Sequence, residues 1–156
     1  MGSRGMSQEV TTLITQLNHR SQVSFLLRQL ARELEARADL HDVTKFKLDE
    51  FFDFVEINQI AREHPFGSKE YNESLKGNRA IELHFSRNRH HPEYHKNGIA
   101  NMNLIDFIEM VCDWIGASRT YGTTDWENVI TEQKRRFKLT ESQLFLINLI
   151  QEHLND

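Results

Sequence analysis

Apolar residues recur at helical spacing along almost the whole of this sequence, and no convincing run alternates with the period of two that a strand requires. Val10, Leu13, Ile14 and Leu17 stand at i, i+3, i+4 and i+7, which places them on one face of a helix. Only two prolines and seven glycines interrupt the 156 residues, too few for a sandwich with many turns. The pattern predicts an all-α fold, a compact single-domain bundle of five to seven helices.

The first half of the chain is expected to form three helical stretches. The first covers about residues 7–40, with a bend where its apolar stripe changes. On the second part of that stripe His19 shares a face with Val23, Leu26 and Leu30, so it is expected to face the interior. A second helix carries the apolar residues between 51 and 60, and a third covers about residues 68–89, weakened by Gly77.

Capping residues mark the helices of the second half. Asn103 precedes a helix that is apolar on most sides, which is typical of a central position in a fold. Two further pairs resemble the capping box that begins a helix: Thr124 with Glu127, and Thr140 with Gln143. These signals predict three helices after residue 103.

Length, charge and composition exclude several classes of protein. The length fits one domain, expected over residues 7–156, while residues 1–6 resemble an expression scar. A net charge of −4 disfavours a protein that binds long nucleic acid or a membrane surface. No apolar run is long enough to span a membrane. One cysteine and no signal peptide favour a cytoplasmic location, which is the host cytoplasm if a phage encodes the chain.

Histidine is the unusual residue, with eight in the chain and seven of them between His19 and His95. Imidazole and carboxylate groups bind Zn²⁺, Mn²⁺ or Fe²⁺, and an adjacent His-Asp pair brings both to one site. The order H…HD…H…HH…D on a helical chain therefore predicts a metal site. Its candidate ligands are His19, His41, Asp42, His84, His90, His91 and Asp113.

Each candidate ligand also has an ordinary structural interpretation. His19 fits a hydrogen-bonded core histidine, and His41-Asp42 could be a helix-break dipeptide that occurs by chance. His90-His91 before Pro92 could be a solvated helix end. Asp113 could be a salt-bridge partner, although a buried carboxylate without a cation costs several kcal/mol, on the order of 3–5. The metal hypothesis depends on the joint pattern and not on any single residue.

The order of these residues resembles the signature of the HD-domain superfamily of metal-dependent phosphohydrolases, which are all-helical. A closer resemblance is to a small family of phage and bacterial proteins of unknown function, with segments that look like HDLSKF, H..RN.HH and EMVxDWIGA. Here these segments begin at His41, His84 and Glu109, and the similarity spans about residues 19–126. The resemblance implies that His19, His41, Asp42 and Asp113 hold a first metal. It further implies that His84 with His90, His91 or both holds a second metal, with Asp42 as the bridge.

The resemblance implies a phosphohydrolase that acts on a nucleotide or another small phosphorylated substrate through metal-activated water. One or two divalent transition metals (Mn, Fe, Zn, Co or Ni) would be the cofactors. Asp42 and Lys45 are the expected catalytic residues, because Lys45 follows the HD pair closely and can contact a phosphate. The expected substrate contacts are Lys45, Arg87, Asn88 and Arg89.

Three other functions remain open at the sequence level, and one substrate is disfavoured. The HD scaffold also hosts di-iron oxygenases, and a metal-stabilised binding protein without turnover would carry the same ligands. The third is a helical interaction module in which the histidines are structural. The segment that follows His91, from Glu93 to Lys96, does not match the GYP motif of cyclic-dinucleotide phosphodiesterases. The sequence does not determine the oligomeric state.

Overall fold

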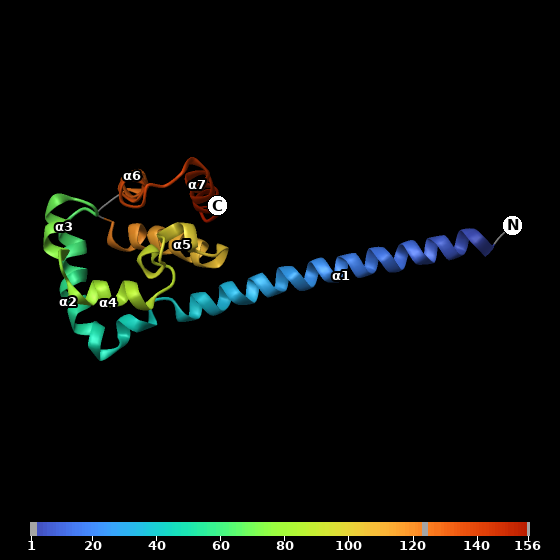
Figure 1. The fold of residues 1–156 in the computed structure, drawn as a ribbon, viewed down its shortest axis with the longest axis horizontal. Coiled ribbons are helices and arrows are strands. Elements are labelled where there is room, and N and C mark those ends of the chain that lie inside the picture. The colour runs from blue at the N-terminus through green and yellow to red at the C-terminus, as the bar shows by residue number, and fades with distance from the viewer. Residues whose placement is uncertain (1–2, 123–124, 156) are drawn as a thin grey trace. The chain divides into compact units, whose positions relative to one another are not determined.

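The computed structural model describes residues 3–122 and 125–155, and this part of the chain is all-helical, without a strand (Figure 1). Three short 3-10 helices, η1 to η3, lie at Val43–Phe46, Pro92–Tyr94 and Gly98–Asn101. The all-α prediction is therefore confirmed. The seven α-helices are α1 Ser3–Leu40, α2 Leu48–Glu63, α3 Lys69–Leu75, α4 Arg79–Arg87, α5 Leu104–Tyr121, α6 Trp126–Phe137 and α7 Glu141–His153.

The chain divides into two compact units, Met1–Asp39 and Leu40–Asp156. The first unit is formed by α1, which continues without a break through the position where a bend was expected. The side chain of His19 is exposed, so the prediction that it faces the interior is wrong. The physical reason is that a single helix has no second element within its own unit against which to bury an apolar stripe.

Gly77 divides the helix that was expected over residues 68–89 into α3 and α4. Its φ of 71° lies in the left-handed region, which glycine adopts without the steric cost that a Cβ brings. Asn78 then begins α4 by accepting hydrogen bonds from the backbone N–H groups of Ala80 and Ile81. The helix ends at Arg87, so the histidines at 90 and 91 lie in the loop beyond it and do not continue the helical face of His84.

Two of the three predicted caps in the second half of the chain are present, and a different residue caps α6. Asn103 caps α5 through the N–H of Asp106, and Thr140 forms a complete capping box with Gln143 at the start of α7. The pair Thr124–Glu127 does not begin α6, because Asp125 is the cap and accepts from the N–H of Asn128. Thr124 lies outside the described residues.

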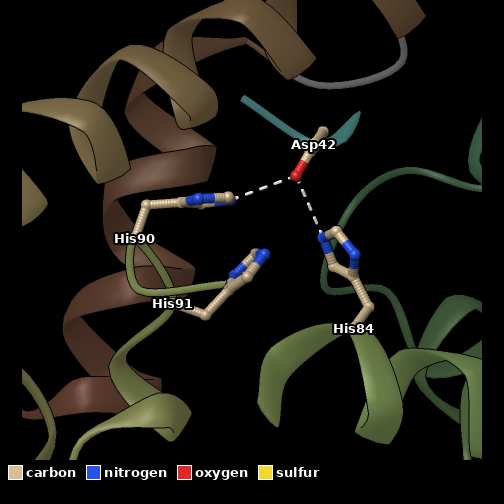
Figure 2. A group of neighbouring side chains, drawn as sticks. All are labelled: Asp42, His84, His90 and His91. Atoms are coloured by element: carbon tan, nitrogen blue, oxygen red, sulfur yellow. Dashed lines mark ion pairs between the residues drawn. The ribbon is translucent and has the colours of Figure 1, made fainter. Parts of the chain in front are cut away.

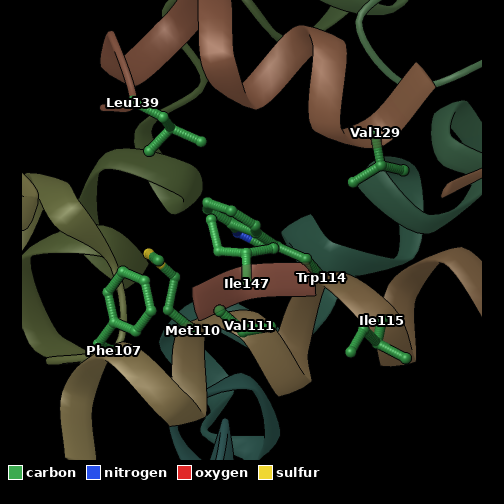
Figure 3. Close-up of a cluster of buried hydrophobic side chains, with 8 residues drawn as sticks. All are labelled: Phe107, Met110, Val111, Trp114, Ile115, Val129, Leu139 and Ile147. Atoms are coloured by element: carbon green, nitrogen blue, oxygen red, sulfur yellow. The ribbon is translucent and has the colours of Figure 1, made fainter. Parts of the chain in front are cut away.

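Helix α5 lies at the centre of the second unit and carries most of its core. Trp114 and Val111 of α5 pack with Ile147 of α7 and Val129 of α6 (Figure 3). The position predicted for this apolar helix is therefore confirmed. A smaller core cluster of Phe54, Ile57 and Ala80 joins α2 to α4. Within the described residues, no helix combines the length and the apolar character that crossing a membrane requires.

Replacement of Ile147 by alanine is expected to lower the free energy of unfolding by about 2–5 kcal/mol, because it leaves a cavity in the core. The side chain of Ile147 is fully buried. Leu149→Ala on the same helix is the matched control, since Leu149 is 46% exposed and its truncation should cost about 0.5 kcal/mol or less. Urea denaturation measures both values, and equal losses would contradict the assignment of α7 to the core.

Candidate metal centre

Asp42 lies at the turn that joins the last residues of α1 to η1, in a conformation uncommon for a residue with a side chain. Its φ is 55° and its ψ is 15°, in the left-handed region where aspartate and asparagine are the most frequent non-glycine residues. The carboxylate is largely buried, with 14% of the side chain exposed. Left-handed residues of this kind are found disproportionately at functional sites.

Helix α4 and the loop after it bring three histidines to this carboxylate. His84 lies near the end of α4, and the loop turns back so that His90 and His91 also face Asp42 (Figure 2). The backbone N–H of His91 donates to the carbonyl of Asn88, and Pro92 begins η2 directly afterwards. Both His84 and His90 are 2% exposed.

Four potential ligand atoms converge on one point. Asp42, His84, His90 and His91 each offer one, and these atoms all lie within 4.8 Å of one another. The Oδ1 atom of Asp42 is 3.1 Å from Nε2 of His84 and 3.3 Å from Nε2 of His90. Four ligands at 2.0–2.1 Å around a tetrahedral metal are about 3.3 Å apart. The spacing therefore fits one transition-metal ion held by three imidazoles and a carboxylate.

The same four atoms lack hydrogen-bond partners. Oδ1 of Asp42 and the Nε2 atoms of His84, His90 and His91 are buried, and none makes a hydrogen bond of acceptable geometry. Buried polar atoms without partners are uncommon in native proteins and costly, at about 1–3 kcal/mol each. Four that face one another are accounted for together by a cation, so the residues present fit a metal.

The electrostatics of two of these four residues, His91 and Asp42, also suit metal binding. Burial, together with the neighbouring His90 and His84, lowers the pKa of His91 to about 2, so its imidazole is neutral near pH 7. Burial favours the neutral form of Asp42, but the imidazoles of His84 and His90 and the charge of Lys45 outweigh it. These neighbours hold the pKa of Asp42 well below its usual range. Metal ligation requires both of these protonation states. At His90 burial opposes protonation, but the contacts with Asp42 and Glu109 outweigh burial and raise the pKa, so a metal there would displace a proton.

A second group of possible ligands contains His41, Asp42, His90 and Asp113. Nδ1 of His41 lies 3.0 Å from Oε1 of Glu109. Its Nε2 lies 3.4 Å from Oδ2 of Asp42 and 3.5 Å from Oδ1 of Asp113. The contacts with Asp113 and Glu109, opposed by burial, raise the pKa of His41 to about 10. A protonated His41 already pairs with these carboxylates, so a metal here would have to displace its proton.

Carboxylates behind the first group orient two of its histidines. Nδ1 of His84 lies 3.2 Å from buried Glu50, which also accepts from Arg87 at 2.7 Å. Nδ1 of His90 lies 3.2 Å from Glu109. A metal-binding histidine usually donates its second N–H to a carboxylate, which leaves the lone pair of the other nitrogen toward the ion. Here the nitrogen that remains is Nε2, the atom without a partner.

A cavity of about 190 Å³ adjoins the cluster. Lys45, His84, His91 and Asp113 form part of its wall. Nζ of Lys45 is 2.5 Å from Oδ2 of Asp42 and 5.0 Å from the centre of the Phe54 ring. Much of the remaining wall is aromatic and includes Phe54, Phe66, Tyr71, Trp114, Tyr121 and Phe137. A small molecule in this cavity would contact the candidate ligands and the Lys45 ammonium group together.

The structure brings six of the seven predicted metal ligands together. The exception is His19, which lies on α1 in the other unit and is absent from both groups of described residues, so its role as a ligand stays a prediction. The six that meet in the second unit are His41, Asp42, His84, His90, His91 and Asp113.

Of the four predicted substrate contacts, Lys45 lines the cavity and the other three have structural partners. Arg87 pairs with Asp49 and Glu50 at the start of α2. The amide of Asn88 donates to Oγ1 of Thr44 and to the carbonyl of His84, which closes the end of α4. The Arg89 guanidinium forms two hydrogen bonds to buried Asp106. Their contact with a substrate remains a prediction.

Three polar residues around the cluster and the cavity were not singled out from the sequence. Glu50 stands in the acidic first turn of α2, where a carboxylate is common for its effect on the helix end, so the sequence carries no sign of its role. Glu109 was visible through its spacing to Asp113, one turn away. Gln133 is a polar side chain within the apolar stripe of α6, and that position was the available signal.

Asp42→Asn is expected to abolish the binding of a divalent transition metal, because it removes the carboxylate charge while asparagine still tolerates the left-handed backbone. Elemental mass spectrometry of protein reconstituted with Mn²⁺, Fe²⁺, Co²⁺, Ni²⁺ or Zn²⁺ measures the loss. Asp53→Asn on the exposed part of α2 is the matched control and should keep its metal. Full metal content in Asp42→Asn would exclude the four-residue site.

Glu50→Gln is expected to weaken metal binding about 10- to 100-fold, because the carboxylate that orients His84 is lost while its shape is kept. Glu56→Gln, an exposed change on the same helix, is the control and should leave the affinity unchanged. Competition with a chromogenic chelator measures the dissociation constants. An unaltered affinity in Glu50→Gln, with the thermal unfolding also unaltered, would show that His84 needs no such partner.

Comparisons with known proteins connect the chain to one family. Neither the curated proteins nor the solved structures contain a significant match. The family profile that matches covers residues 8–155 and therefore includes both units of the chain and every residue of the candidate metal centre. The chain belongs to DUF5662, a family of unknown function.

Proposed function

We propose that this protein is a metal-dependent phosphohydrolase that acts on a small phosphorylated substrate. The observation that carries the proposal is the convergence of four buried atoms without hydrogen bonds, from Asp42, His84, His90 and His91, beside a cavity that Lys45 also lines. The resemblance to the HD-domain superfamily, with its order of histidines and aspartates, agrees with it. The placement of Lys45 in the wall beside two of the histidines supports the choice of a phosphate-bearing substrate.

Each residue of the site would have a distinct role in metal binding, in the orientation of a ligand or in phosphate contact. Asp42 and the three histidines would hold the metal, and Glu50 would fix the orientation of His84. A divalent metal bound there would supply a water molecule of lowered pKa and neutralise charge on the phosphoryl oxygens. Lys45 would donate hydrogen bonds to those oxygens, because Asp42 and the ring of Phe54 hold its ammonium group at the wall of the cavity.

The shape of the site favours a small substrate over a polymer. The cavity volume of about 190 Å³ is below the roughly 300–1,000 Å³ of pockets that hold drug-sized ligands. A net charge of −4 also disfavours a long polyanion. A phosphomonoester with one compact organic group fits both constraints.

A di-iron oxygenase is the second candidate, and the apolar lining of the cavity is the observation that favours it. Aromatic side chains form much of the wall, as an apolar substrate of an oxidation would require. Asp42 belongs to both groups of possible ligands, so it could lie between two ions. Iron in the purified protein, a visible absorption band and no release of phosphate would favour the oxygenase.

Metal-loaded protein is expected to release phosphate from a panel of phosphomonoesters, and Lys45→Met is expected to lower kcat about 100- to 1,000-fold because a donor to the phosphoryl group is lost. Lys69→Met, on the exposed surface of α3, is the control and should keep full activity. A phosphate-release assay with each reconstituted metal measures the rates. Bound metal without hydrolysis of any member of the panel would contradict the proposal and favour a binding protein without turnover.

A further inference from the structure

We propose that the cavity beside the metal centre accepts a planar heterocycle, and that Gln133 recognises a hydrogen-bond donor on that ring. The inference rests on the proposed function, which assigns the phosphate to the side of Lys45 and the histidines. The inference adds the chemistry of the organic group and names Gln133 as the residue that selects this group. The expected substrate class is a phosphate ester of a compact planar ring that bears an N–H group, and the nucleoside monophosphates carry rings of this kind for the test.

The wall of the cavity combines charged or metal-binding groups with flat apolar surface. Lys45, His91 and Asp113 provide the first kind, and Phe54, Trp114 and Phe137 provide the second. Phe54 lies beside Lys45, and the rings of Trp114 and Phe137 lie within 3° of parallel. Aromatic side chains contact planar rings over a large area and at low entropic cost. An apolar planar group therefore suits this wall better than a sugar with many hydroxyl groups.

Apart from the candidate metal ligands His84 and His91, Gln133 is the described residue of the cavity wall with a buried polar atom that lacks a hydrogen bond. It projects from α6 between the turns that carry Val129 and Phe137, and 3% of its surface is exposed. It lines the cavity, and its side-chain oxygen Oε1 has no hydrogen-bond partner. A buried acceptor left unpaired costs free energy, and a ligand that donates an N–H would remove that cost.

Two other polar groups in the wall, those of Tyr121 and Arg136, already have partners. The hydroxyl of Tyr121 donates to Oδ1 of Asn58 at 2.5 Å. The guanidinium of Arg136 pairs with Glu93 and lies over the ring of Phe137, 4.8 Å from its centre. A ligand would compete with these contacts, whereas Gln133 would gain a hydrogen bond that it does not have. We therefore expect Gln133 to discriminate between rings that carry an N–H donor and rings that do not.

The test compares ring recognition with phosphate recognition in the metal-loaded protein. Calorimetry measures the dissociation constants of the four common ribonucleoside 5′-monophosphates, of ribose 5-phosphate and of phenyl phosphate. At least one nucleotide is expected to bind 10-fold or more tightly than both simple phosphates. Ribose 5-phosphate lacks the planar heterocycle, and phenyl phosphate lacks an N–H donor. Where phosphate is released during the titration, the ratio of kcat/KM values replaces the ratio of dissociation constants.

Two variants assign this preference to Gln133. Gln133→Leu is expected to remove the 10-fold preference while the affinity for phenyl phosphate stays unchanged, and Gln133→Glu, which keeps an acceptor, is expected to retain it. Gln59→Leu on the exposed face of α2 is the control. The inference is overturned if no nucleotide is preferred by the wild type, or if the preference survives in Gln133→Leu.

Failure of the proposed function would give a different result. A protein that prefers nucleotides through Gln133 but releases no phosphate would support the ring site and contradict the hydrolase. Rapid hydrolysis of phenyl phosphate without any nucleotide preference would support the hydrolase and contradict the ring site.

Discussion

The second unit is organised around the buried carboxylate of Asp42, whose Oδ1 lies within 3.3 Å of two imidazole nitrogens without a hydrogen bond to either. A buried carboxylate is tolerated only with compensating charge. Lys45, three residues after Asp42, supplies part of this compensating charge. The imidazoles of His84, His90 and His91 face the same point, where four potential ligand atoms lie without hydrogen bonds, and a cation would compensate all four together.

Helix α5 connects this site to the core. Trp114 and Val111 on one side of the helix pack with α6 and α7, while Glu109 and Asp113 on the other side face the histidines. Stability and site geometry therefore depend on the same helix. A core that holds α5 in place also fixes the position of Glu109 beside the imidazoles of His41 and His90.

Periodicity and capping predicted the helical class, the central apolar helix and most helix ends, since these depend on local chemistry such as Asn103 or Thr140. The convergence of candidate ligands was predictable because histidine and aspartate are the residue types that metals select. Glu50 was not, since its contact with His84 follows from tertiary neighbours that no local pattern shows, and Gln133 was marked only by its polar side chain within the apolar stripe of α6. The inward orientation of His19 was predicted wrongly, because a stripe of apolar residues specifies a face of α1 without specifying what covers it.

The two groups of ligands cannot both be complete, and this limits the chemistry. His90 occurs in both, but its Nδ1 faces Glu109 and a single Nε2 is left for a metal. With His90 in the first group, a tetrahedral ion there would have four protein ligands and no open position, as in structural zinc sites. Catalysis then requires either an ion that takes five or six ligands or a second ion held by His41, Asp42 and Asp113. In either case a coordination position stays open for water, and His91 and Asp113 both line the cavity where substrate would meet it.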